Sequence, residues 1–265
     1  MINIDKYRIV DLSPRYIGTL RKLNGEILEG NKAPDSGVIW PLEEVQTVNM
    51  DDSRFTAVGG FPGDPVFPAK LNAHFGSHTE GGKGHIDHWE GIPDTVKGLW
   101  ELPLDTFIGP AAVCNFSDLK PHEEGEAVPQ EPEQYGFSLQ NWRGQAIKPE
   151  HLSNVQKGDI VLMYSPYRGN EMPYIPPETS EWLYKKGIKM LAVQMPGVAW
   201  DSAPKAPAPH NSPTHRNLLG NNIPITYPLA NVETLKKERV FYIGFPLSVE
   251  RMDASWIRAI ALEEI

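Results

Sequence analysis

The segment from His74 to Glu80 combines the residue types of a metal site. It reads His74-Phe75-Gly76-Ser77-His78-Thr79-Glu80, and imidazole together with carboxylate suits Zn, Mn or Fe. On a straight strand His74 and His78 would lie about 13 Å apart, too far to share an ion. A helix would align them, but Gly76 and the glycines that follow make a helix unfavourable. A bend at Gly76 would bring the histidines together, and His78 and Glu80 already share one side of an extended segment.

More histidines surround this segment. Four lie within residues 74–88, and a fifth lies far downstream: His74, His78, His85, His88 and His215. A glycine-rich surface loop that merely contains histidines is the alternative interpretation. The density of imidazoles beside a carboxylate favours a metal site.

The motif His-x-Gly-Ser-His-x-Glu at residues 74–80 is similar to the His-x-Gly-Thr-His-x-Asp signature of the cyclase family of metal-dependent hydrolases, which includes kynurenine formamidase and isatin hydrolase. The resemblance extends over most of the chain. Its further segments are Ile9–Ser13, Leu102–Leu104, Phe107–Ala111, Val155–Leu162, the segment around Trp182, Pro213–Leu219 and Arg258–Ala261. Their order and coverage identify the chain as a member of this family.

The resemblance implies a set of metal ligands. His74, His78 and Glu80 take the ligand positions, and Glu80 stands where the family usually has Asp. That exchange keeps the charge and lengthens the side chain by one carbon. His215 matches a distal histidine that approaches the same centre.

The proton-transfer histidine of the family lies in a Pro-x-His sequence that is altered here. Residues 81–89 read Gly-Gly-Lys-Gly-His-Ile-Asp-His-Trp, so either His85 or His88 is the counterpart. An unperturbed imidazole pKa near 6.5 suits protonation of a leaving group. The neighbouring Trp89 and the distance to Leu102 favour His88.

Tyr227 is the largest departure from the family, which often has Glu at this position. With an unperturbed pKa of about 10, a phenol is a poor metal ligand at neutral pH. We therefore expect one divalent ion, Mn or Zn. A neutral Tyr227 hydroxyl could hydrogen-bond a substrate carbonyl or oxyanion, and packing at a strand edge beside Pro228 is the alternative.

The reaction that the resemblance implies is hydrolysis of an amide, cyclic amide, ester or lactone by a metal-activated water. The chain contains no Gly-x-Ser-x-Gly sequence, which argues against a serine nucleophile. A non-catalytic metal-binding relative is one alternative. A non-haem iron oxygenase with His78, Glu80 and His215 as a two-His-one-carboxylate set is another.

Aromatic residues that could line a pocket for an aromatic substrate, or simply pack, are Trp40, Trp89, Trp100 and Trp200, and His210 could approach the site.

The elements that must position these residues read as mixed α/β. Runs rich in β-branched or aromatic residues predict strands at Tyr7–Leu12, Phe107–Phe116, Asp159–Tyr164, Met190–Gln194, Val240–Phe245 and Trp256–Leu262. Helices are expected at Glu178–Lys186, Asn231–Lys237 and Pro149–Val155. Long loops are expected at Asp118–Gln145 and Pro196–Pro213. The resemblance implies a single domain over residues 1–265 with a β/β/α swivelling fold and a central mixed sheet, and members are commonly dimers or larger.

Composition restricts the partners. A net charge of −9 argues against nucleic acid, because phosphate binding needs clustered cations. No run of about 18 apolar residues and no signal-peptide pattern is present, so we expect no membrane partner. The single cysteine, Cys114, lies in an apolar run, where a buried and inert thiol is expected, and it suits a reducing compartment. A cytoplasmic protein acting on a small molecule is the resulting expectation.

Overall fold

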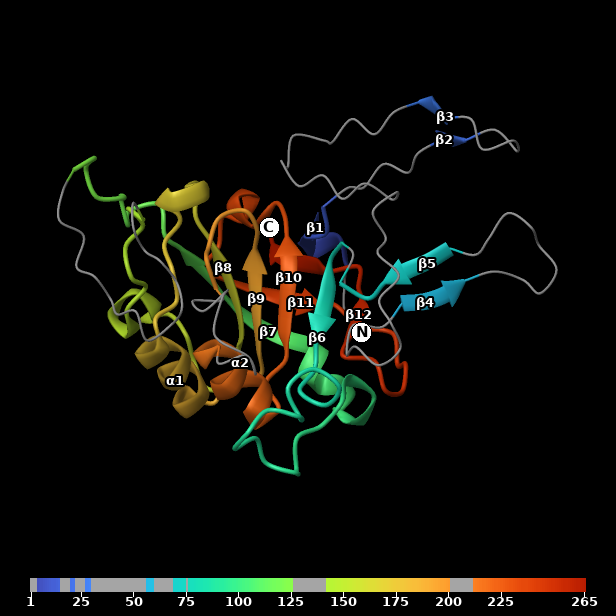
Figure 1. Cartoon of the computed structure of the whole chain (residues 1–265). Coiled ribbons are helices and arrows are strands. Elements are labelled where there is room, and N and C mark those ends of the chain that lie inside the picture. Colours follow the sequence, from blue (N-terminus) through green and yellow to red (C-terminus); the bar gives the residue numbers. More distant parts are fainter. Residues whose placement is uncertain are drawn as a thin grey trace.

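A computed structural model describes the chain over residues 4–14, 20–21, 27–29, 56–59, 69–74, 76–125, 142–200 and 212–265 (Figure 1). The strands are β1 (Tyr7–Asp11), β2 (Leu20–Arg21), β3 (Ile27–Glu29), β4 (Thr56–Gly59), β5 (Ala69–Asn72), β6 (His78–Glu80), β7 (Ile108–Asn115), β8 (Ile160–Tyr164), β9 (Met190–Gln194), β10 (Ile225–Leu229), β11 (Arg239–Ile243), β12 (Ala254–Trp256) and β13 (Ile260–Glu264). The α-helices are α1 (Pro177–Lys186) and α2 (Pro213–Leu218). Short 3₁₀ helices are η1 (Ile4–Lys6), η3 (Leu99–Glu101), η4 (Leu104–Phe107), η6 (Pro149–Leu152), η7 (Gly169–Glu171), η8 (Leu219–Asn221) and η9 (Val232–Thr234).

Within the described residues, one nine-stranded mixed sheet dominates the fold. Its order is β1-β13-β11-β7-β8-β9-β10-β6-β12. The central strands β7 to β10 run parallel, and the strands on both sides join them antiparallel. Strands β2 with β3, and β4 with β5, form separate two-stranded sheets.

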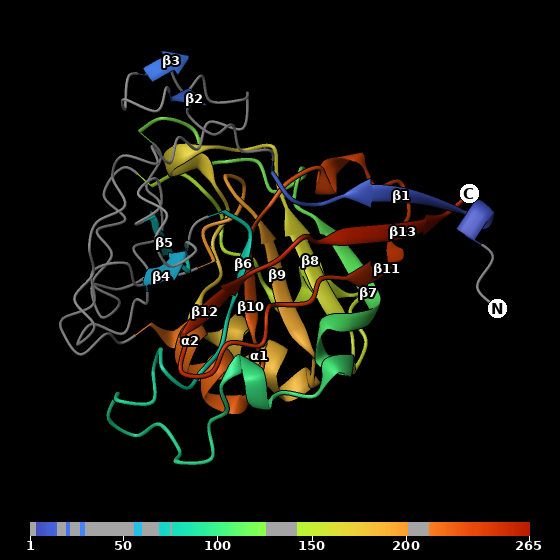
Figure 2. The same ribbon diagram turned by 90° about the vertical axis from the view of Figure 1, so that its right-hand side faces the viewer.

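The strand order requires this sheet to curl. Strand β12 lies at one edge and β13 lies next to the opposite edge, yet only residues 257–259 connect them. In a flat sheet seven strand spacings of about 4.8 Å would separate them by about 34 Å. Three linking residues span at most about 14 Å. The sheet is therefore curled, and Figure 2 shows β12 and β13 following one another across its open side.

Side chains on both faces of the central strands are buried, which explains their continuous hydrophobic runs. On β9, Leu191 belongs to a core that also contains Leu183 of α1 and Leu218 of α2. The neighbouring Ala192 belongs to a second core on the other face, together with Phe107. Because successive side chains of a strand point to opposite faces, a strand between two cores must be apolar at every position.

Five of the six predicted strands are confirmed: Met190–Gln194 has the predicted ends, and the ends of the other four differ by at most two residues. The sixth, Trp256–Leu262, is wrong as a single strand. Trp256 ends β12, whereas Ile260 begins β13 at the other side of the sheet. The break is needed because the chain changes neighbours there: β12 pairs with β6, and β13 pairs with β1 and β11.

The predicted helix Glu178–Lys186 is confirmed as α1, which has Pro177 in its first turn and ends at Gly187 with φ 74°. The predicted helix Asn231–Lys237 is wrong, since only the 3₁₀ turn η9 forms. Asn231 has φ 59°, and its amide donates to the Asp11 carbonyl instead of capping a helix. Pro149–Val155 forms the shorter η6. In the described part of the chain, no helix has both the length and the apolar composition needed to cross a bilayer.

The predicted loops are described only in part. Residues 126–141 of the first loop and 201–211 of the second lie outside the described residues. Helix α2 was not predicted from the sequence. It begins at the end of the second loop, where Pro213 stands at the first helical position after Ser212.

Glu263 on β13 gives a stability prediction. Its buried carboxylate accepts hydrogen bonds from Arg8 Nε and from the Lys237 backbone N–H, both at 2.9 Å. Burial raises the pKa of Glu263, but these hydrogen bonds outweigh burial and lower the pKa below 4.5. The stabilisation is therefore complete above about pH 4.5 and is lost as the pH falls through the lowered pKa of the folded state.

We expect Glu263→Gln to reduce the free energy of unfolding at about pH 7 by about 1.5–3 kcal/mol, because hydrogen bonds to a charged group are lost. The difference from wild type should shrink on going to about pH 3. Urea unfolding at both pH values measures it. The exposed neighbour Glu264 provides the control, Glu264→Gln. Equal losses for the two variants would contradict the assignment.

Candidate metal centre

Strand β6 carries two of the predicted ligands inside the sheet. It pairs antiparallel with β10 on one side and with β12 on the other, so both of its edges are hydrogen-bonded. His78 and Glu80 share one face, each 1% exposed. Thr79 points the other way, where its Oγ1 lies 2.7 Å from Oγ1 of Thr226. The strand therefore holds an imidazole and a carboxylate side by side in a buried place.

A turn at Gly76 returns His74 to this pair. Gly76 has φ 68°, in the left-handed region that glycine favours, which confirms the predicted bend. His74 Nδ1 lies 3.2 Å from His78 Nε2 and 3.2 Å from Glu80 Oε1. The third distance, from His78 Nε2 to Glu80 Oε1, is 3.8 Å.

The two 3.2 Å distances match those between ligands of one ion, whereas the 3.8 Å between His78 Nε2 and Glu80 Oε1 is longer. Two atoms bound at about 2.0–2.1 Å lie about 2.8–3.4 Å apart in octahedral or tetrahedral coordination. In addition, the Nδ1–H of His78 donates to the Gly76 carbonyl at 2.7 Å, which leaves His78 Nε2 free for a metal. His74 Nδ1 thus has the spacing to both other atoms, and His78 the tautomer, that a shared cation requires.

Three further residues join this group. Sets of ligand atoms within 4.8 Å of one another are His74, His78 and Glu80; His74, His85 and Asp253; and Glu80, His85 and His215. The sets overlap, so they form one unit, here called the histidine–carboxylate cluster: His74, His78, Glu80, His85, His215 and Asp253. His215 comes from α2, and its Nε2 lies 3.4 Å from Glu80 Oε2. Such buried clusters suggest a metal site.

Asp253 is the member of the cluster that was not predicted from the sequence. It is buried, and its Oδ2 lies 2.8 Å from His74 Nε2. No spacing connects a single Asp after Met252 with a motif almost 180 residues earlier. Only the pairing of β12 with β6, which places Ala254 opposite Glu80, brings it to the cluster.

His85, and not His88, lies in the cluster. The Gly82 carbonyl accepts from the backbone N–H of His85, and Gly84 has φ 87°, so the turn folds His85 towards Asp253. The His85 ring stacks on His215 with centroids 5.0 Å apart and an interplanar angle of 12°. The His88 side chain is 53% exposed beside Asp87. The structure thus brings His85 to the cluster and leaves His88, the residue preferred from the sequence, away from it, because residues three apart in this turn point in different directions.

Tyr227 has a partner that the sequence did not indicate. It lies opposite His78 in the pairing of β10 with β6, and its Oη donates to Glu80 Oε1 at 2.6 Å. Its ring contacts His78, with centroids 4.4 Å apart, and Trp200, with centroids 4.6 Å apart. The Tyr227 hydroxyl is therefore hydrogen-bonded to the Glu80 carboxylate and is not a group directed only at a substrate.

Electrostatics keep the carboxylates of the cluster ionised. Burial raises the pKa of Glu80, but the charge of His85 and the contacts with His215 and His74 hold it well below 4.5. Burial likewise raises the pKa of Asp253, and the hydrogen bond with His74 and the contact with His85 lower it further than burial raises it. Burial lowers the pKa of His74, but Asp253 and Glu80 together raise it to about 10. Two carboxylates thus attract a positive charge at this point.

The polar atoms left without hydrogen bonds fit a cation. Among the described residues, nothing hydrogen-bonds Asp253 Oδ1, and Glu80 Oε2 has only the 3.4 Å contact with His215 Nε2, although both oxygens are buried from solvent. Leaving a buried polar atom unsatisfied costs about 1–3 kcal/mol, and more for a charged group. Histidine nitrogens beside such carboxylates form the donor set of Zn and Mn sites, so the residues fit the metal that the sequence predicted.

Two tryptophans enclose His215. Trp200 and Trp89 are each 4% exposed, and their ring centroids lie 5.1 and 5.8 Å from that of His215. Trp100 instead lies under Lys83, whose Nζ is 5.8 Å from the ring centroid. Trp40 and His210 lie outside the described residues.

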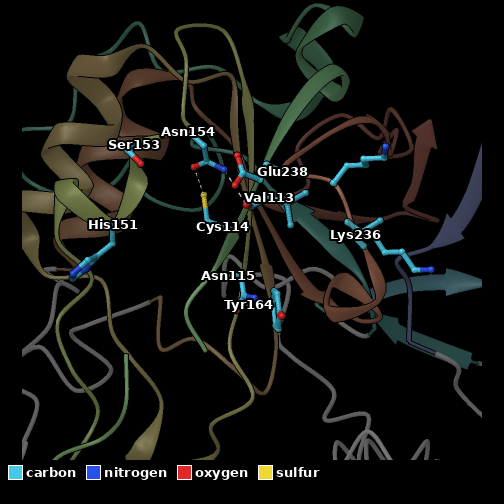
Figure 3. A pocket seen from close by; sticks show the side chains of 11 residues that line it. Val113, Cys114, Asn115, His151, Ser153, Asn154, Tyr164, Lys236 and Glu238 are labelled. Carbon is cyan, nitrogen blue, oxygen red and sulfur yellow. Dashed lines mark hydrogen bonds between the residues drawn. The ribbon is translucent and has the colours of Figure 1, made fainter. Parts of the chain in front are cut away.

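Two side chains that could be alternative nucleophiles, those of Ser77 and Cys114, are not placed for that role. Ser77 is buried and donates to the Pro228 carbonyl at 2.9 Å. Cys114 lies at a separate cavity of about 320 Å³, shown in Figure 3, where it neighbours Asn154 and no cluster residue takes part in the lining. Burial raises the pKa of Cys114 to about 12, so this thiol is unreactive, as its apolar context predicted.

Comparisons with known proteins concern the family and the fold of the chain. A family model described as "Putative cyclase" matches residues 11–200. Isatin hydrolase A from Ralstonia solanacearum is 17% identical with a TM-score of 0.58, over 98% of this chain and 93% of the other. Isatin hydrolase A from Labrenzia aggregata is 18% identical with a TM-score of 0.56, over 98% and 95%. A predicted metal-dependent hydrolase from Bacillus stearothermophilus is 16% identical with a TM-score of 0.52, over 97% and 99%. No curated protein sequence matches significantly. At these identities the solved structures show a shared fold.

Proposed function

Because this chain belongs to the cyclase family, we propose that it is a metal-dependent hydrolase that cleaves an amide, cyclic amide, ester or lactone bond of a small molecule. The observation that carries the proposal is the convergence of His74 Nδ1, His78 Nε2 and Glu80 Oε1 at 3.2–3.8 Å. Two of the solved structures are named for the hydrolysis of isatin, a cyclic amide, and we carry over the reaction class alone.

The proposed cofactor is one divalent ion, Mn or Zn, held by His74, His78 and Glu80 with His215 beside Glu80. When bound, such an ion lowers the pKa of a water molecule from about 15.7 to about 7 and polarises a carbonyl group. Glu80 is suited to this role because its carboxylate stays ionised and its Oε1 is fixed by the Tyr227 hydroxyl.

His85 is the residue we assign to proton transfer. Its side chain is 18% exposed, so it can contact both the cluster and a substrate. Its ring lies against His215, which places it next to Glu80. Protonation of the departing nitrogen or oxygen by His85 would complete bond cleavage, and an imidazole is a suitable acid near neutral pH.

Tyr227→Phe tests the role of the phenol. Removing the hydroxyl leaves Glu80 Oε1 without its 2.6 Å donor while the ring can keep its packing against Trp200. Loss of a group that orients a ligand typically lowers metal affinity or activity about 10–100-fold, and we expect a loss of that size in metal affinity. Competition with a chromophoric chelator measures it.

Tyr167→Phe is the matched control, since the Tyr167 hydroxyl donates to the Ser117 carbonyl at 2.6 Å, outside the cluster. We expect its metal affinity to equal that of wild type. If Tyr227→Phe also binds metal with wild-type affinity, the hydroxyl does not orient Glu80 and Tyr227 contributes packing alone.

The function itself is tested by hydrolysis in metal-reconstituted protein. Purified apoprotein is loaded with Mn or Zn, and a panel of aryl formamides, cyclic amides and lactones is assayed without reductant or oxygen. Hydrolysis that requires the metal supports the proposal. Turnover only with iron, oxygen and a reductant would indicate an oxygenase, and tight metal binding without any turnover would indicate a binding protein.

The proposal extends to the setting of the protein. We propose a homodimer or larger homo-oligomer in the cytoplasm, acting on a small molecule and not on nucleic acid or a membrane, with the β/β/α layering of the family. Light scattering on the purified protein tests the oligomeric state.

A further inference from the structure

We propose that Asp253 is a positioning residue that fixes the orientation of His74 towards the metal and of His85 towards the substrate. This inference rests on the proposed function and deepens it. It adds one carboxylate to the residues that act in the site. This carboxylate comes from the C-terminal part of the chain, more than 170 residues away from the histidine motif.

The backbone holds Asp253 in place. Its carbonyl accepts from the Gly81 N–H at 2.9 Å, and the next residue, Ala254, lies opposite Glu80 in the pairing of β12 with β6. A Cβ atom on Gly84 would lie 3.3 Å from the Asp253 backbone nitrogen, so the turn that carries His85 also packs against this point. The Asp253 carboxylate is buried and cannot swing into solvent.

Asp253 determines which nitrogen of His74 faces the metal. Its Oδ2 lies 2.8 Å from His74 Nε2. An ionised carboxylate only accepts hydrogen bonds, so His74 Nε2 must carry the hydrogen. In the neutral imidazole that a metal requires, the lone pair of His74 is then on Nδ1, the atom 3.2 Å from both His78 Nε2 and Glu80 Oε1. A carboxylate behind a metal-binding histidine is a recurrent arrangement that fixes the tautomer and ring orientation of the ligand.

The same oxygen also faces His85. Asp253 Oδ2 lies 3.6 Å from His85 Nδ1, so one carboxylate stands behind two imidazoles with different tasks. The other oxygen, Oδ1, is buried and has no hydrogen bond within the described residues. A buried carboxylate retained only for stability would normally have both oxygens bonded, as Asp159 has with Arg239. The placement of Asp253 thus indicates a role in orienting the two histidines, not a role in stabilising the fold.

Asp253→Asn tests this assignment without any substrate. The amide keeps the size of the side chain and removes the charge that fixes the His74 tautomer. We expect zinc affinity, measured by chelator competition, to fall about 10–100-fold. We also expect the visible spectrum of the cobalt-substituted protein to change. The control is Asp159→Asn, which alters a buried carboxylate outside the cluster and should lower the melting temperature while zinc affinity and the cobalt spectrum stay as in wild type.

A second measurement uses the unaltered protein and does not depend on how well a variant folds. Histidine ¹⁵N NMR of the zinc-loaded wild type distinguishes Nδ1 from Nε2 coordination, and the His74 signals are assigned by their absence in His74→Ala. We expect His74 to bind through Nδ1 with a hydrogen on Nε2. Coordination through Nε2 would overturn the assignment, because His74 Nε2 would then carry no hydrogen for Asp253 to accept.

The outcomes separate this inference from the proposed function. Wild-type affinity and an unchanged cobalt spectrum in Asp253→Asn would overturn the inference alone. A wild-type protein that binds zinc, has the expected tautomer and hydrolyses nothing would overturn the hydrolase proposal and leave Asp253 in its role. A wild-type protein that binds no divalent metal would overturn both.

Discussion

His78→Ala should lose most of its bound divalent metal. Structural zinc sites have apparent binding free energies of about 10–16 kcal/mol, so one of about four ligands accounts for about 3 kcal/mol, or about 100-fold in affinity. The loss should be near this value because His78 is 1% exposed and lies in an interior strand, so no neighbouring side chain can replace it without disturbing the sheet. Elemental analysis after dialysis, and chelator competition, measure the effect.

The control for this variant is His151→Ala, which removes a histidine of η6 that belongs to no candidate ligand set. It should retain the metal content of wild type. Full retention of metal by His78→Ala would move the site away from β6 and remove the observation on which the proposed function depends.

His85→Ala should retain metal and lose about 10²–10⁴-fold in kcat, the usual contribution of a general acid. Metal is expected to remain because His74, His78 and Glu80 are unchanged and have the mutual spacing of one coordination sphere. The loss should fall on kcat, since a proton transferred in the transition state contributes little to substrate binding. Steady-state kinetics of the metal-loaded variant, with metal content measured on the same sample, tests this.

His88→Ala is the comparison that separates the two histidines. With a side chain that is 53% exposed, His88 should be replaceable with little change in kcat. The reverse order, a severe loss for His88→Ala and a mild one for His85→Ala, would restore the sequence-based preference and show that the turn rearranges around substrate. Two harmless substitutions would exclude both residues from proton transfer.

The relation between Glu80 and Tyr227 explains how this chain departs from the family pattern. Glu80 has a side chain one carbon longer than the usual Asp, and Tyr227 stands where the family often has Glu. The phenol donates to Glu80 Oε1, so the two departures are in contact with one another. This contact supports the expectation of one ion, because Tyr227 provides a hydrogen-bond donor where a second carboxylate ligand would be needed.

The sequence by itself determined the features that depend on local chemistry. Continuous hydrophobic runs such as Met190–Gln194 identify central strands, because a strand buried on both faces must be apolar at every position. Alternation within His78–Glu80 and the glycine at position 76 determined that three ligand atoms could converge, since side-chain direction and left-handed backbone are local properties.

Only the tertiary structure decided which distant residues complete the cluster. Asp253 arrives through the pairing of β12 with β6, and the break before β13 follows from the curl of the sheet. The position of His85 inside the cluster and of His88 outside it follows from a turn that packs against Asp253, and the partner of Tyr227 follows from the register of β10 on β6. Strand order and register are set by the packing of the whole sheet, and residues within a few positions of a motif cannot encode contacts that form between segments far apart in the chain.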